Sequence, residues 1–135
     1  GSFSAGEHND CVAMAKQFAD RTHFVHLRSC YIFPNGNFTE ASHLGGRGQL
    51  IELCRIFEKA EQEGKCNSGR RLPMRVDHGM TFTDEPGGVF DESNHGHNAG
   101  YTLLGRMFAM GQIQGVIATV DDELGIEYKQ PGFYD

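Results

Sequence analysis

Two short stretches decide the fold: HFVHLR at residues 23–28 and LPMRVD at residues 72–77. Successive side chains of a β-strand point to opposite faces of its sheet. In the first stretch Val25 and Leu27 therefore share one face, and His26 lies on the other. The second stretch has the same alternation of apolar and polar residues. Both stretches are predicted to be strands with one apolar face and one charged face.

On the charged face, the polar side chains lie near the carboxyl end of each predicted strand. His26 and Arg28 end the first strand, and Arg75 and Asp77 end the second. In a barrel of alternating strands and helices the active site is built at this end, and the apolar faces turn to the helices. We therefore expect His26 and Asp77 to be neighbours at such a site.

Amphipathic patterns predict three helices around these strands. The first begins after Asn9 or Asp10, either of which can cap it. The second spans about residues 49–63 and ends at Gly64, and the third spans about residues 101–120. The resulting order of helix, strand, helix, strand, helix is typical of parallel strands with crossover helices. Two parallel strands do not form a stable sheet alone, so the pattern indicates that part of the fold lies outside these residues.

The rest of the chain is predicted to form loops and a tail. Loops are expected at 33–48 and 79–99, where Gly, Asn and Pro are frequent, and a peripheral tail at 121–135. The third helix is predicted to carry Leu104, Met107, Phe108, Gly111 and Gly115 on one side.

The composition is that of an acidic globular domain. The 135 residues include 12 basic and 18 acidic side chains, a formal charge of −6, which argues against general binding to nucleic acid. No apolar run is expected to reach the roughly 20 residues of a membrane-spanning helix, so no membrane association is predicted. The four cysteines, Cys11, Cys30, Cys54 and Cys66, contain no C-x-x-C pair and favour neither a zinc ribbon nor a disulfide scaffold. A reducing, cytoplasmic setting is the default for such a chain.

His26 and Asp77 are the strongest candidate pair for binding a metal. A histidine nitrogen beside a carboxylate oxygen suits Mn²⁺, Fe²⁺ or Zn²⁺ better than calcium. Two ligands are too few, so others have to come from elsewhere. The alternative is a hydrogen-bonded core histidine and an aspartate that caps a turn, and the repeated strand pattern leaves both interpretations open.

Other polar residues near the strand ends could act on a substrate. His78 has the chemistry of a general acid or base, or it belongs to a polar Asp-His-Gly turn. Arg28 could bind a substrate carboxylate; the alternative is a structural salt bridge, which is favoured more for Arg75. Glu40 and His43 lie in the first long loop, where they either overhang the site or are solvated.

Three more residues have a possible chemical role. Tyr101 begins the third predicted helix, where its phenol could donate a proton or simply pack against the helix start. His95 and His97 suggest a metal site, but no third ligand lies at a usable spacing. A solvated loop is therefore favoured for this histidine pair.

Five stretches together resemble the mannonate dehydratase family of sugar-acid lyases. They keep that family's order and spacing from Gly1 to about Val120, although none of them is specific alone. The stretches are GSF at 1–3, FVHLRS at 24–29, EASHL at 40–44, PMRVDHG at 73–79 and GYTLLGR at 100–106.

The resemblance implies an α/β fold, the C-terminal part of a xylose-isomerase-like (β/α)8 TIM barrel. Residues 1–120 would supply helix 6, strand 7, helix 7, strand 8 and helix 8, followed by the tail at 121–135. A complete barrel takes about 250 residues or more, so the other strands are expected upstream. On this reading the start at Gly1 is a truncation.

The resemblance also implies a site for Mn²⁺ or Fe²⁺ built from two histidines, a cysteine and an aspartate. Two of these ligands are expected upstream, with the cysteine directly before Gly1. The loop at 80–99 departs from shorter versions in the family, which leaves its role open. The implied roles in this chain are metal ligands His26 and Asp77, catalytic residues His78 and Tyr101, and substrate-binding residues Arg28 and His43.

The implied activity is dehydration of D-mannonate to 2-keto-3-deoxy-D-gluconate and water in hexuronate degradation. It is expected of a full-length, cytoplasmic, homo-oligomeric protein, whereas the isolated segment lacks half of the metal ligands and is expected to be inactive. One alternative is another xylose-isomerase-like sugar isomerase or epimerase, which needs no acid for a leaving group. The other is a non-catalytic metal- or sugar-binding module.

Overall fold

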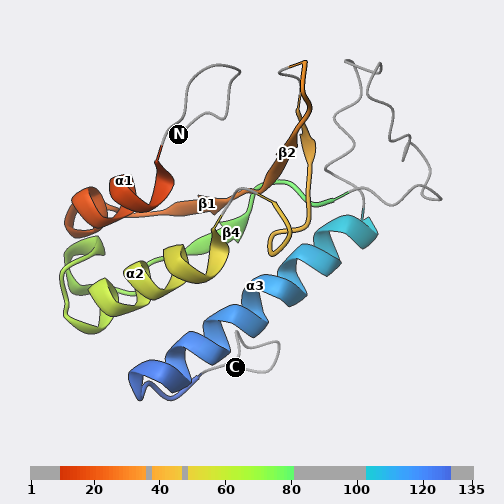
Figure 1. Ribbon diagram of the computed structural model, residues 1–135. Helices are drawn as coiled ribbons and strands as arrows, with labels where there is room; N and C mark the ends of the chain where they lie inside the picture. Colours follow the sequence, from red (N-terminus) through yellow and green to blue (C-terminus); the bar gives the residue numbers. More distant parts are fainter. Residues whose placement is uncertain (1–9, 36–37, 47–48, 81–102, 129–135) are drawn as a thin grey trace.

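Helices and strands alternate along the chain in the computed structural model, which describes residues 10–35, 38–46, 49–80 and 103–128 (Figure 1). The helices are α1 (Cys11–Phe18), α2 (Leu50–Gln62) and α3 (Leu103–Leu124), with short 3-10 turns η1 (Ala19–Arg21) and η2 (Asn67–Gly69). The strands are β1 (Val25–Leu27), β2 (Cys30–Ile32), β3 (Phe38–Glu40) and β4 (Met74–Val76).

Strands β1 and β4 are paired in parallel, as expected for strands joined through a crossover helix. His26 lies opposite Arg75 in the register. The Asp77 amide donates to the Leu27 carbonyl at 3.0 Å, which places Asp77 directly beside the end of β1. Leu27 and Val76 are buried whereas His26 and Arg75 are exposed, so the predicted division of the two faces is confirmed.

Local signals set the helix ends. The Asp10 side chain accepts a hydrogen bond from the Ala13 amide at 2.9 Å, so Asp10 is the N-cap of α1. After α2, Gly64 adopts a φ of +66°, which glycine reaches without a steric penalty. The Lys65 amide then donates back to the Ala60 carbonyl at 2.8 Å and closes the last turn. The predicted start of α1 and end of α2 are confirmed.

The three helices lie on the buried face of the β1–β4 pair (Figure 1). Helix α2 packs against both α1 and α3, and α3 also contacts β4. Leu27 and Val76 of the strands meet α2 and α3 in the main core. The helices therefore support the backs of the two strands and leave the face of His26 open. The helix residues of this core are Leu50, Cys54, Ala109, Ile113, Val116 and Val120.

A β-hairpin occupies part of the predicted loop at 33–48. Strands β2 and β3 pair antiparallel, with Cys30 opposite Glu40. The Ala41 amide donates to the Ser29 carbonyl at 2.9 Å and extends the pairing. Each strand has only three residues, too few for an alternation pattern to stand out among the surrounding Gly, Asn and Pro. The loop prediction was therefore wrong for these residues, and the hairpin returns Glu40 to the end of β1.

The buried side of α3 is not the side that the sequence pattern singled out. All five residues of the predicted side, Leu104, Met107, Phe108, Gly111 and Gly115, are exposed. The buried side carries Gly105, Ala109, Ile113, Val116 and Val120. Both sides of the helix are apolar, so periodicity could not select the one that meets α2 and β4. The helix also continues past its predicted end at Val120, to Leu124.

Helix α3 is long and apolar enough to span a membrane, judged by its 22 residues and its composition alone. The expectation that no apolar run reaches such a length does not hold for this helix. One side of α3 packs on α2 and β4, which is the arrangement of a core helix in a layered α/β protein.

Candidate functional site

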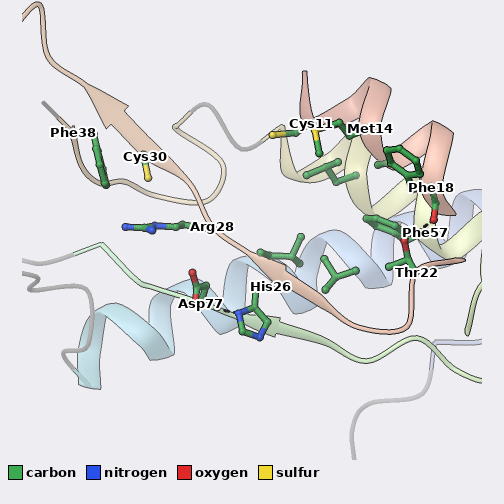
Figure 2. Close-up of a pocket in the computed structure, with 14 residues that line it drawn as sticks. Cys11, Met14, Phe18, Thr22, His26, Arg28, Cys30, Phe38, Phe57 and Asp77 are labelled. Carbon is green, nitrogen blue, oxygen red and sulfur yellow. Dashed lines mark hydrogen bonds and ion pairs between the residues drawn. The ribbon is translucent and has the colours of Figure 1, made fainter. Parts of the chain in front are cut away.

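The carboxyl ends of β1 and β4 bring His26 and Asp77 together (Figure 2). The distance from His26 Nδ1 to Asp77 Oδ1 is 3.3 Å. The His26 side chain is 46% exposed, which excludes the alternative of a core histidine. The edge of the Phe24 ring also contacts the His26 ring, with centroids 4.9 Å apart. The structure therefore confirms the expected adjacency, and the use of this pair as metal ligands stays a prediction.

His78 is buried between two carboxylates. Its Nε2 lies 3.6 Å from Asp77 Oδ2, and its Nδ1 lies 3.8 Å from Glu40 Oε1. Both distances are longer than a hydrogen bond, so these contacts are electrostatic. The ring is thus held in a defined place beside the His26–Asp77 pair, where a general acid or base could reach a bound substrate.

Arg28 forms a salt bridge with Glu40. Arg28 Nε lies 3.1 Å from Oε1 and 3.2 Å from Oε2 of Glu40, and Nη2 also contacts Oε1. The Phe38 ring centroid lies 5.3 Å from the guanidinium carbon. Burial lowers the pKa of Arg28, but the hydrogen bond and charge of Glu40 outweigh it and raise the pKa above its ordinary value. The structural salt bridge is therefore present at Arg28, and its contact with a substrate stays a prediction.

Glu40 lies between Arg28 and His78, at the site that one of its two predicted alternatives placed it near. Its side chain is only 8% exposed, and it faces both Arg28 and His78. The alternative of a solvated loop residue is therefore wrong for Glu40. The sequence holds no clear local signal for this position, because Glu40 reaches the site only through the pairing of β3 with β2, the strand that follows Arg28.

His43 and Arg75 lie apart from this cluster. His43 is 2% exposed, and its Nε2 donates to the Leu27 carbonyl at 3.0 Å, so it is not a solvated loop residue. The His43 amide also donates to Gln112 Oε1 of α3 at 3.0 Å. A substrate contact by His43 stays a prediction. Arg75 Nε donates to the neighbouring Val76 carbonyl at 3.3 Å, and Arg75 has no ion pair within the described part of the chain.

Cys30 is the cysteine nearest to the site, and its environment keeps it a thiol. It is 1% exposed. Burial, and then the negative charge of Glu40, raise the pKa of Cys30 to about 11.

A cavity of about 400 Å³ opens between α1 and β1 (Figure 2). Met14 and Phe18 of α1 line its apolar side, and His26, Arg28 and Asp77 line its polar end. The edge of β1 that faces away from β4 has no paired strand among the described residues. The polar cluster therefore lies at one end of an apolar groove that runs beside an open strand edge.

Several predicted residues lie outside the part of the chain that the structure describes. Tyr101, His95 and His97 are among them, as are residues 81–102 in general. Of the predicted metal ligands and proton-transfer residues, the structure therefore places His26, Asp77 and His78.

Two described residues, His26 and Asp77, could contribute ligands to a metal site. His26 and Asp77 offer nitrogen and oxygen donors on the open face, a set that suits Mn²⁺ or Fe²⁺. Within the described residues, no group of three or more His, Cys, Asp or Glu side chains is arranged to hold a metal. The donor chemistry therefore fits such an ion only with further ligands from elsewhere.

Comparison with known proteins identifies the family. Residues 1–126 match the family described as D-mannonate dehydratase (UxuA). The chain is similar to mannonate dehydratase 2 of Agrobacterium fabrum (strain C58), with 37% identity over 126 residues, 92% of this chain and 30% of that protein. It is 35% identical over 123 residues to the mannonate dehydratase of Saccharophagus degradans, covering 90% of this chain and 30% of that protein.

A third relative, the mannonate dehydratase of Brucella canis, is 32% identical over 122 residues, covering 90% of this chain and 28% of that protein. The chain thus spans about 30% of the length of the curated relatives that it matches. The family match extends over nearly all of the chain and includes every residue of the strand-end cluster. The chain belongs to the D-mannonate dehydratase (UxuA) family.

Proposed function

We propose that this chain is the C-terminal portion of a metal-dependent mannonate dehydratase. The observation that carries the proposal is the parallel β1–β4 pair, which sets His26 beside Asp77 at the carboxyl ends in a member of this family. The full-length protein would convert D-mannonate to 2-keto-3-deoxy-D-gluconate and water. It would act in the cytoplasm as a homo-oligomer.

The proposed fold of the full-length protein is a TIM barrel in which β1 and β4 are strands 7 and 8. The open edge of β1 and the groove beside it leave room for a preceding strand. Helix α3 also exposes large apolar side chains, with Leu103 74% and Met107 59% exposed. Contiguous apolar surface of this kind marks a place where other parts of a protein pack. A barrel would cover both surfaces.

His26 and Asp77 would hold Mn²⁺ or Fe²⁺ together with upstream ligands. When bound, the metal would stabilise the negative charge that develops on the substrate carboxylate as the C2 proton leaves. Asp77 faces His26 with Oδ1 and His78 with Oδ2, so one side chain orients both rings. This arrangement couples the position of the metal ligand to that of the proton-transfer residue.

His78 and Tyr101 would carry the two proton transfers. Dehydration removes a proton from C2 and adds one to the hydroxyl leaving C3, so it needs one base and one acid. His78 follows β4, and Tyr101 precedes α3 by two residues in the sequence. Gly79 lies against the backbone of Gly105, which supports a short distance between the end of β4 and the start of α3.

Arg28 and His43 would serve the substrate pocket. Glu40 holds Nε and Nη2 of Arg28 at the end of β1, where the guanidinium would meet the carboxylate of a sugar acid. Glu40 thereby limits the directions in which the guanidinium can point. His43 would support the pocket from the buried side, because it is bonded to the carbonyl of Leu27, the residue before Arg28.

The test uses a chimera in which residues 1–126 replace the matching segment of the Agrobacterium fabrum relative, here called the Agrobacterium chimera. We expect Mn²⁺-dependent dehydration of D-mannonate by the chimera. In a Tyr101→Phe variant the rate should fall by about 100-fold or more, because the leaving hydroxyl loses its acid or C2 its base. The measurement is the steady-state rate of keto-acid formation.

Phe33→Tyr is the control. It adds a phenol hydroxyl outside the predicted site and should leave the rate unchanged. A Tyr101→Phe variant with full activity would favour a sugar isomerase or epimerase, which needs no leaving-group acid. Absence of activity in a folded chimera that binds Mn²⁺ would favour the non-catalytic module.

A further inference from the structure

Two carboxyl groups are buried between α2 and α3, away from the strand ends. Glu58 of α2 is 9% exposed, and Asp121 of α3 is 4% exposed. Contacts of Arg55 with Glu123 and of Gln62 with the Leu124 carbonyl join α2 and α3 beside these two residues, so both carboxyl groups lie in the same helix contact. Asp121 Oδ1 has no hydrogen-bond partner among the described residues. Burial of this pair is therefore favourable when it carries no charge or one charge, and unfavourable when both carboxyl groups are charged.

Few groups around this pair can offset a second charge. Helix α2 contributes Glu61 and Cys54, and the segment before β4 contributes Arg71. Cys54 is fully buried, and burial followed by the charges of Glu58 and Asp121 raises the pKa of Cys54 to about 12. Arg71 is the cation that favours the charged forms of Glu58 and Asp121, but Arg71 is exposed to solvent. Because solvent screens its charge, Arg71 offsets only part of the cost of burying two charged carboxyl groups.

We propose that Glu58 and Asp121 form a pH-sensitive latch that closes the α2–α3 interface when they share a proton and loosens it when both are charged. The interface is the main packing contact of α3. The core behind it buries Leu27 and Val76, which directly precede the site residues at the ends of β1 and β4. The latch therefore acts on the layer that supports the site, and it does not depend on the proposed reaction.

The direction of the pH dependence follows from the burial of Glu58. Burial, and then the charge of Asp121, raise the pKa of Glu58 from 4.5 to about 7. Its contribution to stability is fully present below pH 4.5 and is lost as the pH rises through about 7. Burial also raises the pKa of Asp121, in the same direction. A carboxylate stabilised by a salt bridge would give the opposite trend.

The experiment is urea unfolding of the Agrobacterium chimera, followed by far-UV circular dichroism, for the parent chimera (the wild type below), Glu58→Gln and Asp121→Asn. Each variant keeps the shape of the protonated acid and cannot become charged. From about pH 5 to about pH 8, the unfolding constant of the wild type relative to each variant should rise by about tenfold or more. The exposed neighbour Asp122 provides the control, because Asp122→Asn should give a ratio that does not change with pH.

Asp121→Asn is an independent test of the same pair if Glu58→Gln fails to fold. A ratio that is constant across the pH range for both variants would overturn the latch. Failure of both variants to fold would overturn it as well, because each mimics the protonated state in which the latch is closed.

Discussion

Replacing Asp77 with alanine in the Agrobacterium chimera should lower the rate of D-mannonate dehydration by about 1,000-fold or more, the effect of losing several kcal/mol of transition-state stabilisation. The Asp77 side chain faces both His26 and His78. Its removal would therefore take away one proposed metal ligand and the carboxylate beside the proposed proton-transfer ring of His78. The loss should be accompanied by loss of bound Mn²⁺, measured by elemental analysis of the purified chimera.

The Asp77→Ala variant is expected to fold, because the hydrogen bond from residue 77 to Leu27 is made by the backbone amide. Asp20→Ala is the matched control: Asp20 is an exposed aspartate that pairs with Arg21, and its loss should change neither the rate nor the metal content. If Asp77→Ala retained its Mn²⁺ and a rate within tenfold of the parent chimera, the assignment of Asp77 as a metal ligand would be wrong.

The second large effect concerns the fold. Gly79→Ala should destabilise the chain by about 3 kcal/mol or more, as expected for a steric clash that neither side can relieve. A methyl group on Gly79 would lie 2.4 Å from the carbonyl oxygen of Gly105 and 2.8 Å from the amide nitrogen of Arg106. These are backbone atoms at the beginning of α3, so either β4 or the helix has to move. The measurement is the urea midpoint of the Agrobacterium chimera.

Gly115→Ala is the matched control for this prediction. Gly115 lies within α3, and a methyl group there would meet nothing within 4 Å in the described structure. Alanine is the better helix former by about 0.5–1 kcal/mol, so this variant should be slightly more stable than the parent. A Gly79→Ala chain with an unchanged urea midpoint would show that the close approach of β4 and α3 is absent in solution.

The sequence predicted those parts of the site that follow from parallel strand pairing. Alternation in residues 23–28 and 72–77 identified both strands and the face on which each residue lies. Parallel pairing then requires that the two carboxyl ends meet, which is why His26 and Asp77 could be placed together without a structure. Helix ends were predictable for a similar reason, because Asp10 and Gly64 act on the backbone within a few residues.

The features that the sequence did not predict depend on long-range contacts. Glu40 joins Arg28 and His78 only because a hairpin of three-residue strands folds back on the end of β1. Helix α3 is apolar on two sides, and the choice of the side that carries Ala109 is made by α2 and β4. The pairing of Glu58 with Asp121 likewise joins two helices far apart in the sequence. Local sequence patterns do not identify contacts between residues that are far apart in the chain.

The central claim is that this chain carries part of the active site of a mannonate dehydratase. It is tested most directly by the product that the Agrobacterium chimera, loaded with Mn²⁺, forms from D-mannonate in D₂O. Loss of the C2 proton and the C3 hydroxyl leaves an enol, which takes up its proton from solvent at C3. We predict a 2-keto-3-deoxy acid with one deuterium at C3, seen by NMR. Deuterium at C2 of a sugar acid that keeps its C3 hydroxyl would contradict the claim.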